Sequence, residues 1–105
     1  ESISGQLPPS ITTFYANGIG TKYFERNMFD TISAGVLTDL ALGSNQYGST
    51  EINKIISYLW ESVAALDSGA SIDLSGQTPT APPLASLGLQ SFLNTINNTA
   101  TITTD

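Results

Sequence analysis

Residues 49–66, STEINKIISYLWESVAAL, constrain the fold more than any other stretch, because their apolar period is long and unbroken. The apolar positions are Ile52, Ile55, Ile56, Leu59, Val63 and Leu66. They recur three or four residues apart, the spacing of one helix face. We expect Ser49 or Thr50 to cap the start and Gly69 to end the helix. The stretch therefore predicts an amphipathic helix that buries one side, against the rest of the chain or against a partner.

Two further stripes suggest additional helices. Between Thr21 and Leu42 the apolar positions are Phe24, Met28, Phe29, Ile32, Val36, Leu37 and Leu40. Their spacing predicts a second long helix, in which Gly35 marks a close crossing. Residues 84–98 keep a looser stripe, with Pro83 able to begin a helix. Residues 11–17 are expected to form a short helix starting at Pro9, or else a short strand.

The remaining segments lack a helical period. Residues 1–10 contain Gly5, Pro8 and Pro9 and predict an extended arm. Residues 67–83 hold two Gly and three Pro and indicate a long loop or a linker. Residues 99–105 alternate Thr with Ala and Ile, as a frayed tail or an edge strand would. No internal repeat is visible, and we expect a mainly α fold: one domain over residues 1–105, built as a small bundle of three to four helices.

Charge limits the partners that this chain can bind. Nine acidic residues against Lys22, Arg26 and Lys54 give a net charge of −6. A nucleic-acid backbone or an anionic membrane surface would be repelled. No run of about 18 apolar residues is present, so we expect no membrane insertion. The expected partners are other proteins, or further copies of the same chain.

The chain contains neither Cys nor His. Disulfides, thiolate metal sites and the commonest general base are therefore excluded. Neither Lys22 nor Lys54 has the spacing to Ser that a Ser-Lys nucleophile requires. We expect no cofactor and no enzymatic activity.

Two small constellations have both a structural and a functional interpretation. Asp67 and Asp73 flank a Ser-rich segment without a nearby positive charge and are candidates for a low-affinity cation site, although their spacing matches no established calcium loop. Asn17-Gly18-Ile19-Gly20 contains part of a phosphate-binding pattern but lacks its third glycine, so it predicts a turn.

Trp60, with Tyr58 and Tyr47 near it in the sequence, is the notable aromatic group. Trp60 lies at the margin of the stripe on residues 49–66. It is either a tryptophan at the edge of the core or an anchor in a protein interface. These three aromatics are our candidate interface residues.

The composition favours a structural or interaction protein that is bound within an assembly. Charged residues make up only 11% of the chain, and 13 Ser and 13 Thr replace them on the surface. A small domain without a disulfide or a metal has a small free energy of unfolding, so docking into an assembly would stabilise it. We expect a structural or interaction subunit of a virion or extracellular filament, or alternatively an accessory subunit of an exported enzyme that binds through the Trp60 side. The location expected is extracellular or in a virion, since residue 1 is Glu and favours a trimmed chain.

Overall fold

The computed structural model describes residues 2, 3, 5–83, 94–96 and 100–105. Its elements in chain order are β1 (Ser2–Ile3), β2 (Thr13–Tyr15), β3 (Tyr23–Phe24), the 3-10 helix η1 (Arg26–Phe29), β4 (Leu37–Ala41), α1 (Ser49–Glu61), the 3-10 helix η2 (Val63–Ala65), β5 (Leu66–Asp73) and β6 (Ala100–Thr103). This is an α/β fold, so the predicted mainly α bundle is wrong.

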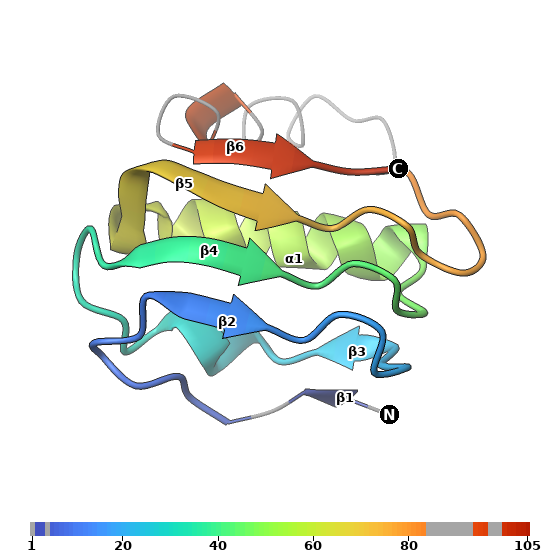
Figure 1. Ribbon diagram of the computed structural model, residues 1–105, viewed down its shortest axis with the longest axis horizontal. Helices are drawn as coiled ribbons and strands as arrows, with labels where there is room; N and C mark the ends of the chain where they lie inside the picture. Colours follow the sequence, from blue (N-terminus) through green and yellow to red (C-terminus); the bar gives the residue numbers. More distant parts are fainter. Residues whose placement is uncertain (1, 4, 84–93, 97–99) are drawn as a thin grey trace.

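Four strands form a parallel sheet whose spatial order follows the chain, β2-β4-β5-β6. After β2 and again after β4, the chain turns, runs through a second layer behind the sheet and returns beside the strand that it left (Figure 1). We call residues 13–36 the first coil and 37–65 the second, and the third begins at β5. Stacked coils of this kind build a solenoid, in which each unit contacts mainly its neighbours.

The second layer contains α1, together with η1 and β3 (Figure 1). The strand β3 pairs in parallel with β1, so the N-terminal segment joins this layer rather than the main sheet. The predicted arm over residues 1–10 thus includes a short strand. Backbone bonds from Leu7 N–H to Met28 O and from Ser33 N–H to Pro9 O hold the rest of it.

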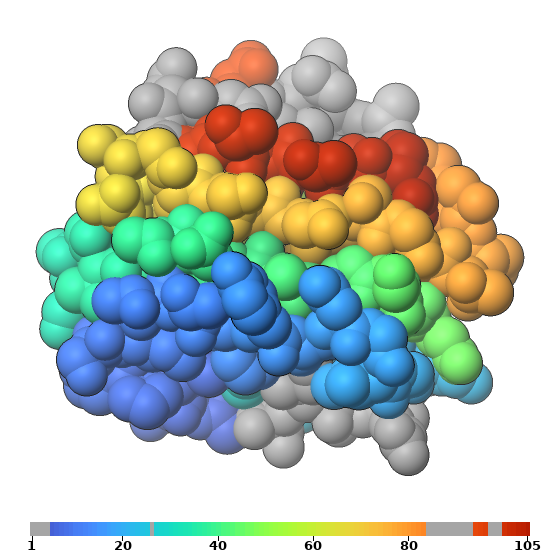
Figure 2. Space-filling model, in the orientation of Figure 1, coloured from blue at the N-terminus to red at the C-terminus, as the bar shows by residue number. Residues whose placement is uncertain are grey.

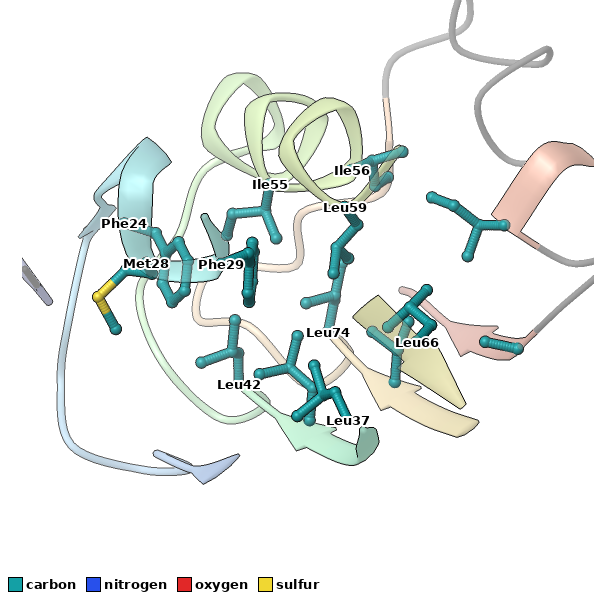
Figure 3. Packing of buried hydrophobic residues seen from close by; sticks show 14 of the residues in the cluster. Phe24, Met28, Phe29, Leu37, Leu42, Ile55, Ile56, Leu59, Leu66 and Leu74 are labelled. Atoms are coloured by element: carbon teal, nitrogen blue, oxygen red, sulfur yellow. The ribbon is translucent and has the colours of Figure 1, made fainter. Parts of the chain in front are cut away.

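The helix α1 confirms the strongest sequence prediction. Ile52, Ile55, Ile56 and Leu59 are at most 1% exposed. Ile55 and Leu59 point from α1 toward the strands (Figure 3). Their burial contributes roughly 6–12 kcal/mol before chain entropy is counted, an upper bound. The helix begins after Gly48, which is its N-cap without a side-chain hydrogen bond, so the cap predicted at Ser49 or Thr50 is wrong. It ends at Glu61, and η2 then leads directly into β5 at Leu66.

The helix predicted between Thr21 and Leu42 is wrong, although its apolar residues are buried, Val36 only in part. That segment contains β3, η1 and β4. A register shift between Leu37 and Asp39 leaves Leu37 and Leu40 both buried, three positions apart. A β-bulge of this kind produces a helix-like spacing within a strand. Gly35, with φ of 69°, lies in the turn before β4 rather than at a helix crossing.

The loop predicted over residues 67–83 is also wrong in its first part, because β5 extends through Asp73. Gly69, expected to end a helix, lies inside this strand with φ of 92°. Residues 13–15 and 100–103 confirm the strand alternatives for segments 11–17 and 99–105. Of the helix predicted over residues 84–98, only 94–96 lie within the described residues, and these are helical.

Candidate binding face

One face of the parallel sheet is turned away from α1. Its strands form four adjacent bands that no other described segment covers in the space-filling view (Figure 2). Parallel sheets normally carry helices on both faces, and their strands are then buried on both sides. An open face is therefore the most unusual surface of this molecule.

Two cross-strand rows of side chains make up this outer face. The first row is Thr13, Asp39, Ser71 and Thr101, and the second is Tyr15, Ala41, Asp73 and Thr103. Alternate residues of each strand point outward, while Phe14, Leu40, Ile72 and Ile102 point to the core. We use the name outer face for the eight residues of these two rows.

The outer face is hydroxylated and acidic. Asp73 accepts hydrogen bonds through Oδ1 from the backbone N–H of Ser75 at 2.9 Å and from its hydroxyl at 2.6 Å. Its second oxygen, Oδ2, is not used in these bonds. Asp39 accepts one bond, from the hydroxyl of Thr38 at 3.2 Å. Tyr15 is 67% exposed and is the largest side chain of the two rows.

Buried side-chain amides fix the turns that follow the strands. Asn45 is 1% exposed and lies in the turn after β4. Its Oδ1 accepts from the backbone N–H groups of Ile19 and Thr21 in the first coil. Its Nδ2 donates to the carbonyl oxygens of Ala16, Leu42 and Gly43. One side chain thereby holds two coils together.

Gln77 repeats this role one coil later. It is 4% exposed, and its Oε1 accepts from the N–H of Tyr47 at 3.2 Å. Its Nε2 donates to the carbonyl oxygens of Leu42 and Leu74, both at 3.0 Å. We call Asn45 and Gln77 the amide ladder, and their equivalence reveals a structural repeat where the sequence showed none. The register pairs Leu40 with Ile72 and Ala41 with Asp73, and the bonds from Leu42 N–H to Asp73 O and from Ser44 N–H to Ser75 O continue this offset to the two amides.

Asp105 closes the turn of the third coil in a related way. Its carboxylate accepts from the backbone N–H groups of Gly76, Gln77 and Ala81. The bond from Ala81 and then that from Gly76 are the main reasons that the pKa of Asp105 lies below its usual 3.8. The ionised carboxylate is favoured because these donors stabilise its charge.

A pocket of about 330 Å³ lies on the other layer, where α1 begins. It is lined by Lys22, Tyr23, Gln46, Gly48, Thr50, Glu51 and Lys54, and we call it the lysine pocket. Glu51 is largely buried, and its Oε2 accepts from the N–H of Phe24 at 2.9 Å. Lys54 Nζ is 3.9 Å from the other oxygen of Glu51. Two of the three basic residues of the chain therefore share one pocket.

The structure does not bring the predicted aromatic candidates together on one surface. Tyr47 is fully buried, and its hydroxyl accepts a hydrogen bond from that of Thr21 at 2.6 Å. Burial raises the pKa of Tyr47 above its usual 10.0, and the charge of Glu51 acts in the same direction. Tyr58 is half-buried, and only Trp60 is exposed, at 40%. Sequence reasoning missed Tyr15 and Asp39 as site residues, because it placed Asp39 on a helix and gave Tyr15 no role beyond a short helix or strand.

The cation site proposed for Asp67 and Asp73 lacks a shared geometry. These residues lie at opposite ends of β5, and Asp73 uses one oxygen to hold Ser75. Within the described ranges, no three acidic, His or Cys side chains cluster as metal ligands would. The turn predicted at 17–20 is confirmed, with positive φ at Gly18 and Gly20.

Among the helices that the structure describes, none is long and apolar enough to span a bilayer. Searches with protein-family models, curated proteins and solved structures find no match to this chain.

Proposed function

We propose that this protein is a non-enzymatic structural or interaction protein, a subunit of a larger assembly that contacts its partner through the outer face. The carrying observation is a parallel sheet with one face that no described segment covers (Figure 2). Solenoids of stacked coils bind partners on extended surfaces of this kind.

The chemistry of the outer face suits protein recognition. Tyr15 offers a large ring with a polar end, a residue type enriched where interfaces gain most of their energy. The Thr, Ser and Asp side chains around it supply directional hydrogen bonds. A flat arrangement of short side chains loses little conformational entropy on binding.

The amide ladder supports the same proposal, because it fixes the turns that follow the strands of the outer face. Asn45 and Gln77 connect the turns of successive coils through buried hydrogen bonds. Among the described residues, every buried side-chain nitrogen and oxygen has a partner. A preorganised surface of this kind loses little conformational entropy when a partner binds.

A peptide-display selection tests the proposal. A random dodecapeptide library is selected on the wild-type protein, and the enriched peptides are measured against Ser71→Trp, which places a bulky ring in the middle of the outer face. We expect at least a tenfold loss of affinity. The matched control is Ser33→Trp, at an exposed serine in the turn before β4, and it should leave affinity unchanged. Equal binding to all three proteins would contradict the proposal.

The exposed ring of Trp60 favours a second candidate, binding through the helix as in an accessory subunit of an enzyme complex. Trp60 and Leu59 are neighbours with opposite burial, 40% against 1% exposed. Leu59→Ala should cost about 2–5 kcal/mol of unfolding free energy, and Trp60→Ala clearly less. If the selected peptides lose affinity for folded Trp60→Ala but not for Ser71→Trp, the helix is the binding surface.

A further inference from the structure

We propose that the partner on the outer face is a second copy of this chain, whose lysine pocket receives Tyr15. This inference rests on the proposed function, and it names the occupant of the outer face. Each copy carries both contact surfaces, the outer face and the lysine pocket, and the two differ in charge and in shape.

Charge is segregated between the two surfaces. The outer face carries Asp39 and Asp73, and the described part of the chain places no basic side chain in its two rows. Lys22 and Lys54 line the lysine pocket instead. Opposite surface potentials steer association and fix its register. Two of the three basic residues of the chain line this pocket, which gives the acidic face a complementary surface on a second copy.

Shape supports the same pairing. Tyr15 protrudes from β2 with 67% of its surface exposed. The lysine pocket is a hollow of about 330 Å³ with an aromatic wall, Tyr23, itself 59% exposed. Docking would remove both rings from water together, as paired aromatic anchors do in protein interfaces.

The spacing of the acidic groups fits this arrangement. Tyr15, Ala41 and Asp73 are cross-strand partners, so Asp73 lies two strands from the Tyr15 ring, about 10 Å away. The small Ala41 between them leaves space for the rim of the pocket. Lys22 and Lys54 are long and flexible, and they can reach Asp73 and Asp39 once the ring is inserted. Glu51 keeps its negative charge in the pocket, 3.9 Å from Lys54 Nζ, so the pocket sets two positive charges against one negative charge and stays net positive.

Because the contact joins two different surfaces of the chain, the same contact can form again with a third copy. The outer face belongs to the sheet, and the lysine pocket lies in the layer of α1 and β3 (Figure 1). Each copy therefore keeps one free surface after pairing. Such heterologous contacts produce rings when the rotation closes and open filaments when it does not.

Sedimentation analysis of charge-swapped variants tests the inference. The wild-type chain should form oligomers that grow with concentration. The double variants Asp39→Lys/Asp73→Lys and Lys22→Glu/Lys54→Glu should each be monomeric, because each opposes like charges across the contact. An equimolar mixture of the two should assemble again. Asp30→Lys, at an exposed acid outside the outer face, is the control for net charge and should assemble like the wild type.

Circular dichroism of each variant verifies that it is folded, and Tyr15→Ala provides an uncharged variant that should weaken assembly at least tenfold. A wild-type chain that remains monomeric at millimolar concentration would overturn the inference. So would assembly that survives both charge swaps, or a mixture that stays monomeric. If the chain is monomeric but displayed peptides still lose affinity for Ser71→Trp, only self-association fails and the binding face stands.

Discussion

The side-chain amides of Asn45 and Gln77 both donate to the carbonyl oxygen of Leu42, each at 3.0 Å. One amide comes from the same turn as that carbonyl and the other from the next coil. A single backbone oxygen thus accepts hydrogen bonds from the turns of both the second and the third coil. Hydrogen bonds buried in this way are costly to remove, because the groups left behind have no water to replace the lost partner.

Replacing Asn45 by Ala should therefore strongly destabilise the protein. The change removes bonds to two N–H groups and three carbonyls, and several of them would be left buried without partners. We expect the free energy of unfolding to fall by about 3–5 kcal/mol. Urea unfolding measures it. Asn27→Ala, at an exposed position of η1, should change it by no more than about 0.5 kcal/mol. Similar losses in both variants would contradict the role given to Asn45.

Gly43→Ala should be destabilising because the chain is closely packed there. A Cβ at Gly43 would lie 2.8 Å from the carbonyl oxygen of Ser75 and 3.2 Å from Oδ2 of Asp73. The first neighbour is backbone and cannot move cheaply, so we expect a loss of about 1–3 kcal/mol.

The matched control for Gly43 is Gly48→Ala. A Cβ at Gly48 has no neighbour within 4 Å, and its φ of −78° suits any residue. The expected loss there is about 1 kcal/mol or less, from the weaker helix cap. Chemical denaturation measures the loss of unfolding free energy in both variants. A larger loss in Gly48→Ala than in Gly43→Ala would show that crowding at Gly43 is unimportant.

Asp105 predicts a dependence of stability on pH. The N–H groups of Ala81 and Gly76 lower its pKa in the folded protein below the usual 3.8. A lowered folded pKa means that the stabilisation is present in full above about pH 4 and disappears as the pH falls through the folded value. Asp105→Asn should therefore have a lower urea midpoint than the wild type at pH 7, and the two midpoints should converge toward pH 2. A constant difference across this range would contradict the assignment.

The sequence predicts the core of this protein better than its elements. Met28, Phe29, Ile32 and Leu40 were expected to be buried, and they are. The spacing that suggested their helix has other causes. Met28 and Phe29 lie in the 3-10 helix η1, and Leu37 and Leu40 flank an irregularity where the N–H groups of Thr38 and Asp39 both donate to the carbonyl oxygen of Thr12. In α1 the same spacing does belong to a helix, and there the prediction is confirmed over Ser49–Glu61.

The candidate site could be predicted only in part. Ala70, Ile72 and Leu74 alternate with Ser71, Asp73 and Ser75, which is a strand period. Gly69 and Gly76 on either side favoured a loop instead. Tyr15 belongs to a three-residue strand, too short for any period to show. Which residues share a row depends on the register between strands, and this register is set by contacts far apart in the sequence.

Because the strands are stacked in chain order, a pulling force applied between β2 and β6 would act across the sheet, at right angles to the strands. The hydrogen bonds between neighbouring strands would then break one after another, instead of all carrying the load at the same time. A tether that ran through this sheet would yield gradually, coil by coil, rather than snap.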